Sequence, residues 1–224
     1  MAMRTKRDAL GPLERQARAA LRESARTMAR LERGNGAAVA AAAEALIACF
    51  GSGGTAFFCG NGGSAADAQH LAAEFAGRYL VDRPGLPAVA LTTNTSALTA
   101  IGNDYGYAQV FSRQLEGLGQ PGDLLVAITT SGRSASIRRA VREAHRRGMT
   151  VIGMTGARGA EFAALCDIAL VSPHDVTPNI QEAHIAMGHA FCLLVERALF
   201  PAATAVRRPA TRRAGKANGR RARR

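Results

Sequence analysis

The sequence predicts an α/β fold in which a five-stranded parallel sheet carries helices on both faces, in a doubly wound arrangement. Short, nearly continuous apolar runs alternate along the chain with longer segments whose apolar residues recur at helical spacing. Strands that are buried on both faces read as continuous apolar runs, and parallel neighbours need a crossover helix between them. With 224 residues, 47% of them hydrophobic, the chain has material for one sizeable core, and nothing indicates a second.

The expected elements follow from this alternation. Residues 12–50 are rich in Ala, Leu, Arg and Glu and are interrupted by Gly34-Asn35-Gly36, which predicts two N-terminal helices joined by a tight connection. The expected strands are 55–59, 88–91, 124–128, 150–154 and 168–171. Further helices are expected to begin near Ser64 and Ser134, and to lie at 96–101, 110–118, 161–165 and 179–200.

The net charge of +12 is concentrated at one end of the chain. Nine Lys and Arg residues lie between Arg207 and Arg224 with no acid among them, which leaves only +3 for the other residues. A stretch with almost nothing to bury is expected to be disordered, and it could contact nucleic acid nonspecifically. We therefore expect a flexible N-terminus at 1–11, one domain at 12–202 and a disordered basic tail at 203–224.

The composition also bears on the compartment. No apolar run approaches the roughly 20 residues of a membrane span, and the charged N-terminus has no apolar signal core behind it. We therefore expect no membrane contact and a cytoplasmic location. The four cysteines lie in apolar surroundings without a C-x-x-C pair, so they are expected to be reduced core residues: Cys49, Cys59, Cys166 and Cys192.

A glycine-rich turn, Gly60-Asn61-Gly62-Gly63-Ser64, directly follows the first expected strand and opens a helix. Glycines let the backbone come close to a ligand, and the first turn of a helix offers free N–H groups at the positive end of the helix dipole. The turn is therefore predicted to bind an anion. Further along the same helix, His70 and Glu74 are four residues apart and share a face, where they could hold a divalent metal or divide acid and base work.

A second loop, Thr129-Thr130-Ser131-Gly132-Arg133-Ser134, follows the expected central strand and also opens a helix. Its hydroxyls and exposed amides suit a phosphate monoester, which accepts many short hydrogen bonds. Neither loop has the spacing of a Walker or dinucleotide-binding motif. Open α/β sheets bind ligands beyond the carboxyl ends of their strands, so both loops are expected to belong to one ligand site.

The last long helix carries the remaining reactive groups, which are Gln181, Glu182, His184 and His189. Gln181 and His189 are eight residues apart, roughly 12 Å along an ideal helix axis, so one metal between them is geometrically demanding. Gln181 with His184 is the easier pair by spacing. Periodicity alone does not favour His189 over His184.

Five motifs resemble the sugar isomerase (SIS) domain family, and within it the phosphoheptose isomerases, over about residues 12–200. They are G-N-G-G-S-A-A-D-A-Q-H-L-A-A-E at 60–74, R-P-G-L-P-A at 83–88, A-I-G-N-D-Y-G-Y at 100–107, T-S-G-R-S at 130–134, and N-I-Q-E-A-H at 179–184 followed by His189. The resemblance implies a single SIS domain with a flavodoxin-like sheet and a homotetramer. It also implies an aldose–ketose isomerase that converts D-sedoheptulose 7-phosphate to D-glycero-D-manno-heptose 7-phosphate, the first step toward bacterial heptose precursors for lipopolysaccharide or other surface glycans.

The resemblance implies roles for individual residues as well. One Zn²⁺ per subunit would be held by His70, Glu74, Gln181 and His189, with Glu74 as the base and His189 as the acid partner in proton transfer through an enediol. The implied substrate and phosphate ligands are Asn61, Gly62, Gly63, Ser64, Asp67, Asn103, Asp104, Thr129, Thr130, Ser131, Ser134 and Gln181.

Three positions depart from the resembling family. Thr129 stands where its members commonly have Ser, and it keeps a hydroxyl. Arg133 stands where its members commonly have Asn, and it could add a charge to the phosphate site or point into water. Asn94 stands where they often carry Asp.

A rival interpretation is a tetrameric SIS scaffold that binds the bacterial replication initiator DnaA without catalysis. The basic tail fits a protein that works near DNA, whereas the complete set of four implied metal ligands favours the enzyme.

Overall fold

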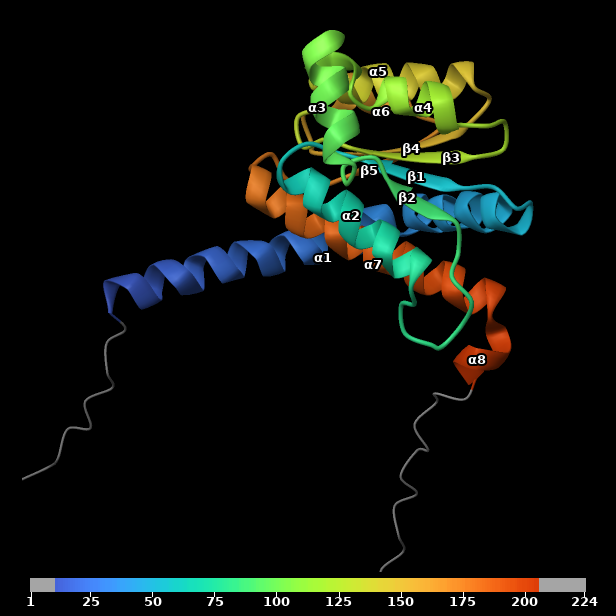
Figure 1. The fold of residues 1–224 in the computed structure, drawn as a ribbon. Coiled ribbons are helices and arrows are strands. Elements are labelled where there is room, and N and C mark those ends of the chain that lie inside the picture. The colour runs from blue at the N-terminus through green and yellow to red at the C-terminus, as the bar shows by residue number, and fades with distance from the viewer. Residues whose placement is uncertain (1–10, 206–224) are drawn as a thin grey trace, which may run out of the picture.

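The computed structural model describes residues 11–205 and contains one five-stranded, all-parallel sheet (Figure 1). Its strands are β1 (Ala56–Cys59), β2 (Ala88–Ala90), β3 (Leu124–Ile128), β4 (Thr150–Thr155) and β5 (Ile168–Val171). The strand order is β2-β1-β3-β4-β5, which confirms the expected flavodoxin-like, doubly wound sheet. Strands β3 and β5 coincide with the ranges expected from the sequence. The expected terminal segments fall largely outside the described residues.

Helices cover both faces of the sheet (Figure 1). One face carries α1 (Pro12–Gly51), α2 (Gly63–Ala76) and α7 (Thr177–Leu199). The other face carries α3 (Thr95–Asp104), α4 (Ser112–Leu118), α5 (Ala135–Arg146) and α6 (Ala160–Ala163). A 3-10 turn, η1 (Tyr107–Gln109), precedes α4. A short helix, α8 (Pro201–Ala205), follows α7, beyond residue 200, where the last helix was expected to end.

Two hydrophobic cores, one on each face, explain the apolar runs of the strands. Along β1, Ala56 and Phe58 belong to the core beneath α1, α2 and α7, whereas Phe57 and Cys59 belong to the core beneath α4 and α5. Successive side chains of a strand point to opposite faces, so a strand covered on both sides needs apolar residues at every position. All residues of β1 and β3 are accordingly buried.

The prediction of two helices between residues 12 and 50 is wrong, because α1 runs without a break through Gly34-Asn35-Gly36. Each helical glycine costs only about 1 kcal/mol relative to alanine. The helix formers on either side outweigh that cost, as does the packing of Val39 and Leu46 in the core. Gly34 and Gly36 have open space where a Cβ would be, so no close contact forces the chain to turn there.

Length and composition alone would let α1 cross a membrane, contrary to the expectation that no segment is apolar enough. Its second half instead forms part of the core, where Ala42 and Leu46 have no exposed surface. A helix that is apolar nearly all round is also what a buried core position requires. With a third of the apolar window buried, packing within the chain accounts for part of the composition of α1.

Helices α2 and α7 lie side by side on the sheet and run in the same direction (Figure 1). Gly63 at the start of α2 contacts the side-chain amide of Gln181, and Leu71 in its middle packs against Gly188. A Cβ on Gly188 would lie 2.5 Å from Leu71 Cδ2, closer than carbon atoms approach without displacement. This close approach brings the faces of the two helices into the contact on which the site depends.

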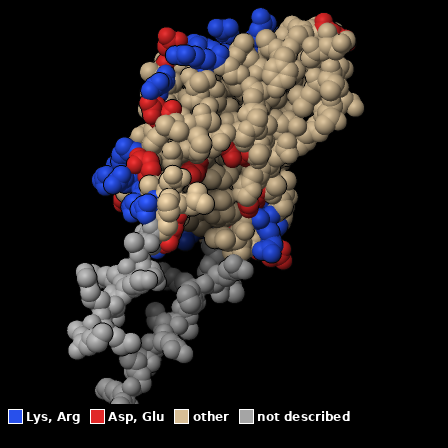
Figure 2. All heavy atoms as spheres, turned by 90° about the vertical axis from the view of Figure 1, so that its left-hand side faces the viewer, with Lys and Arg blue, Asp and Glu red and all other residues tan. Residues whose placement is uncertain are grey.

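Charged side chains are unevenly spread over the surface. Figure 2 shows the side toward which the N-terminal end of α1 points, where Lys and Arg gather mainly along one edge, interspersed with acidic groups. Much of this face carries neither sign.

Candidate active site

Both predicted anion loops lie at the same edge of the sheet. Strands β1 and β3 are parallel neighbours, with Cys59 opposite Ala127, so the loop at 60–63 and the loop at 129–134 leave the sheet next to each other. The chain continues from β1 to β2 on one side and reaches β3 on the other, which makes this edge a topological switch point. Ligands of open α/β sheets bind at such points.

Asn61 joins the two loops by hydrogen bonds. Its Nδ2 atom donates to Ser134 Oγ at 2.7 Å and to Ser136 Oγ at 3.0 Å, and its Oδ1 atom accepts from the Tyr107 hydroxyl at 2.9 Å. Both ends of the amide are therefore satisfied, and the loops are held in one arrangement. Ser136 and Tyr107 were missed from the sequence, although Tyr107 ends the quoted motif at 100–107.

The start of α2 is shaped for close approach by a ligand. Gly62 has φ +56°, a conformation that residues with a Cβ rarely adopt. The amides of Ser64 and Ala65 donate to the carbonyls of Asn61 and Gly62, whereas the amides of Gly62 and Gly63 have no such acceptor within residues 11–205. These two amides are the donors that the turn can offer to an anion.

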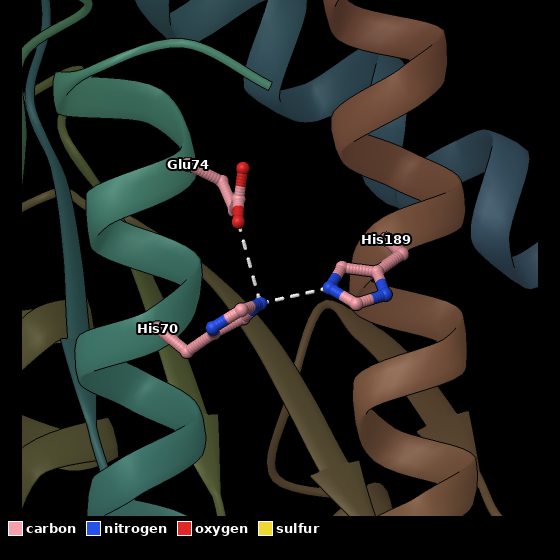
Figure 3. A group of neighbouring side chains, drawn as sticks. All are labelled: His70, Glu74 and His189. Carbon is pink, nitrogen blue, oxygen red and sulfur yellow. Dashed lines mark hydrogen bonds and ion pairs between the residues drawn. The ribbon is translucent and has the colours of Figure 1, made fainter. Parts of the chain in front are cut away.

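A group of three side chains connects α2 with α7 (Figure 3). His70 and Glu74 project from α2 toward His189 on α7. His70 Nε2 lies 2.8 Å from His189 Nε2 and 3.4 Å from Glu74 Oε1. The ligand atoms of all three residues lie within 4.8 Å of one another, although 119 residues separate the two histidines in the sequence.

This group fits a divalent metal ion. Zinc binds imidazole nitrogen and carboxylate oxygen at about 2.0–2.2 Å, which places ligand atoms of a tetrahedral site roughly 3.3 Å apart. The observed separations of 2.8 and 3.4 Å bracket that value, so small side-chain rotations would open the position. Three protein ligands leave one position of a tetrahedral zinc site open, for Gln181 or for substrate.

The structure distinguishes the two histidines, His184 and His189, between which spacing along the helix could not choose. His184 has no exposed surface, and neither of its ring nitrogens has a hydrogen-bond partner within the described part of the chain. Burial lowers the pKa of His184 to about 4, and a contact with the Thr155 backbone opposes that shift only in part. His189 is the histidine that meets His70. Gln181 lies beside Gly63, seven residues before His70, and its role as a metal ligand stays a prediction.

The polar residues expected to line the sugar are placed as follows. Asp67 is half-buried on α2, its Oδ2 atom has no hydrogen-bond partner among residues 11–205, and burial raises its pKa while His70 opposes the shift. Asn103 and Asp104 lie exposed at the end of α3, where Asn103 Nδ2 donates to Asp104 Oδ1 at 2.8 Å. Asn94 caps the same helix by accepting from the Ala97 amide at 3.0 Å, a role that Asp would fill equally well.

The second loop borders a hollow of about 170 Å³ that reaches to the start of α7. Thr130, Ser131 and Arg133 line it from the loop, and Arg158, which sequence reasoning missed, lines it from the segment after β4. Arg158 is paired with Asp175, also in the lining. Thr129 is buried behind the loop. Arg133 thus lies at the hollow beside the loop hydroxyls, and its contribution to phosphate binding stays a prediction.

Comparison with known proteins agrees with this fold and site. Residues 21–156 match the SIS domain, so the chain belongs to the SIS domain family. Its similar relatives are phosphoheptose isomerases. The one from Rhodospirillum rubrum is 56% identical over 162 residues, which cover 72% of this chain and 86% of that protein, and the one from Burkholderia pseudomallei (strain K96243) is 56% identical over 164 residues, 73% and 83% of the two chains. Within the family, the chain falls among the phosphoheptose isomerases.

Solved structures give the same result. The phosphoheptose isomerase GmhA from Neisseria gonorrhoeae superposes with a TM-score of 0.78 at 47% identity, covering 82% of this chain and 98% of that one. A phosphoheptose isomerase from Francisella tularensis superposes with a TM-score of 0.80 at 36% identity, covering 84% and 100%. The likeness therefore extends over nearly all of the described fold and includes the helices that carry the site.

Proposed function

We propose that the protein is a metal-dependent aldose–ketose isomerase that converts D-sedoheptulose 7-phosphate to D-glycero-D-manno-heptose 7-phosphate, the first step of heptose precursor synthesis in the bacterial cytoplasm. The observation that carries the proposal is the meeting of His70, Glu74 and His189, two of which lie on the helix that the first predicted anion loop opens. The names of its relatives support the substrate class. An acid/base group next to a phosphate site is the combination that isomerisation of a sugar phosphate requires.

The phosphate group supplies orientation. The free amides of Gly62 and Gly63, with the hydroxyls of Ser64, Thr130, Ser131 and Ser134, are proposed to hold the phosphate and the adjoining sugar atoms. Arg133 adds a positive charge at the edge of this set. Fixing one end of the substrate places the carbonyl and the adjacent carbon at a defined point, which lowers the entropic part of the barrier.

Proton transfer is assigned to Glu74 and His189. Glu74 removes a proton from the carbon next to the carbonyl and returns it to the neighbouring carbon, while His189 donates a proton to the carbonyl oxygen and later accepts one from the adjacent hydroxyl. The Glu74 side chain is only 21% exposed, which shields the transfer from bulk water. His70 lies between the two groups and holds them at their observed separation.

The metal is proposed to be Zn²⁺, held by His70, Glu74 and His189 with Gln181 as a further ligand. When bound there, it would polarise the substrate carbonyl as a Lewis acid.

A homotetramer is part of the proposal. The N-terminal half of α1 projects beyond the body of the molecule (Figure 1), and it exposes Leu13 and Leu21. Where α1 crosses α7, an apolar groove is lined by Met28, Leu31 and Met187 among others. Exposed apolar stripes of this kind are suited to burial against a second copy of the chain.

The test is turnover of D-sedoheptulose 7-phosphate by the purified, zinc-loaded protein, followed by the appearance of the aldose phosphate. Glu74→Gln and His189→Ala should each lower kcat by about 100-fold or more, because general acid and base groups contribute 10²–10⁴-fold. Glu182→Gln is the matched control, since Glu182 is exposed on α7 and pairs with Asn179. Chelation should abolish turnover and zinc should restore it.

The proposal is rejected if the folded wild type does not form the aldose. Binding of the protein to the replication initiator DnaA would then be measured as the alternative function. Full activity of Glu74→Gln would instead leave an isomerase with a different base.

A further inference from the structure

A buried ion pair lies just beyond the proposed metal ligands. Arg83, from the segment after α2, donates from Nε to Glu196 Oε2 on α7 at 3.1 Å. The two side chains are only 1% and 2% exposed, and the Phe200 ring covers the guanidinium at 5.4 Å. Neither residue belongs to the proposed substrate or metal site.

The guanidinium of Arg83 donates hydrogen bonds to the carbonyls at the C-terminal end of α2. Its Nη2 atom donates to the Glu74 carbonyl at 2.8 Å, and its Nη1 atom donates to the Phe75 carbonyl at 2.9 Å and the Gly77 carbonyl at 3.3 Å. The last carbonyls of a helix have no partner within the helix, and they form the negative end of its dipole. The buried guanidinium donates hydrogen bonds to these carbonyls and also places a positive charge at the negative end of the dipole.

The carboxylate of Glu196 fixes the segment that carries Arg83. It accepts from the backbone amides of Tyr79 at 3.1 Å, Leu80 at 2.9 Å and Val81 at 3.1 Å, in addition to the Arg83 contact. Glu196 is therefore fully used as an acceptor by residues that immediately follow α2. The C-terminal end of α2 is tied through these bonds to one point on α7.

That point has a fixed relation to the site. Glu196 follows His189 by seven residues, two helical turns or roughly 10.5 Å along α7. Glu74 is bound to the pair through its own carbonyl. The pair therefore ties the C-terminal end of α2 to one level of α7, the helix that carries His189.

We propose that Arg83 and Glu196 are positioning residues for Glu74: they hold the helix end that carries the base in register with the helix that carries His189. The inference rests on the proposed function, because it gives Glu74 the catalytic role. A buried ion pair adds little net stability compared with well-packed apolar residues, whereas its hydrogen bonds are directional and define one geometry. Misplacement of a catalytic group by about 1 Å can cost roughly 100-fold in rate.

The test compares Arg83→Lys and Glu196→Gln with the wild type, with kcat and KM measured separately on folded protein. Lysine keeps the charge but cannot reach Glu196 and all three carbonyls at once, and glutamine keeps the shape but not the charge. We expect kcat to fall at least 10-fold while KM changes less than 3-fold, because neither loop of the phosphate site is touched. Arg146→Lys, on the outer face of α5 and paired with Glu143, should leave both constants unchanged.

A second readout does not depend on turnover. Cobalt(II) titrated into the metal-free proteins reports ligand geometry through its visible absorption spectrum. Both variants should bind it at least 10-fold more weakly or with an altered spectrum, because Glu74 is displaced, whereas Arg146→Lys should match the wild type.

One result is decisive against the inference. Variants that lose thermal stability but keep the wild-type kcat and cobalt spectrum in the folded fraction would show that the pair only stabilises the fold. An inactive wild type would reject the proposed function, and the cobalt comparison would still decide whether the pair positions Glu74. If either Arg83→Lys or Glu196→Gln does not fold, the same measurements on the other variant test the proposal.

Discussion

Replacement of Gly188 by alanine tests the close contact between α2 and α7. In an unhindered helix this change would stabilise the protein by about 1 kcal/mol. Here the new Cβ would lie 2.5 Å from Leu71 Cδ2 and 2.9 Å from Leu71 Cδ1, and Leu71 has no exposed surface into which to move. Overpacking of a core costs about 1–3 kcal/mol, so the net effect of Gly188→Ala should be a loss of about 0–2 kcal/mol.

Gly34→Ala is the matched control. Gly34 also lies within a helix, but nothing is within 4 Å of the position a Cβ would take, so this variant should gain about 1 kcal/mol. The two variants should therefore differ by about 1–3 kcal/mol in the free energy of unfolding, measured in urea at one protein concentration.

Activity gives a second measure of the same contact. Leu71 follows His70 and Gly188 precedes His189, so a wider spacing of the helices would separate the two imidazoles. Gly188→Ala should therefore lower kcat by about 10-fold or more, whereas Gly34→Ala should not. Equal unfolding free energies for the two variants would refute the close packing on which this reasoning rests.

Two further predictions concern the phosphate loop and a buried histidine. Arg133→Asn should weaken the binding of inorganic phosphate several-fold, because an exposed charged contact contributes about 1 kcal/mol. Calorimetric titration measures this affinity, and the control Arg139→Asn should bind phosphate as the wild type does. Equal affinities of Arg133→Asn and the wild type would mean that Arg133 points into water. Burial lowers the pKa of His184 to about 4 from 6.5, so the unfolded chain takes up a proton first as pH falls. The contribution of His184 to the free energy of unfolding should be fully present above pH 6.5 and should fall by about 1.4 kcal/mol per pH unit toward pH 4. Urea unfolding of His184→Gln should lack this part of the pH dependence.

The sequence by itself determined the fold class, most of the strands and the two loops. These features depend on local patterns, because a strand covered on both faces must be apolar throughout and a loop that approaches a ligand needs glycine or hydroxyl residues. The strands at 124–128 and 168–171 were placed correctly for this reason. Local pattern was wrong about α1, since helix propensity and packing across Gly34-Asn35-Gly36 outweighed two unfavourable residues.

Only the tertiary structure decided which reactive residues meet. Spacing along the last helix could not choose between His184 and His189, whereas the tertiary structure buries the first and brings the second to 2.8 Å from His70. The bonds of Asn61 to Ser134 and of Arg83 to Glu196 likewise join residues 73 and 113 positions apart. Such contacts leave no periodic signal in the sequence, because they depend on the register of one helix along another rather than on the pattern within either.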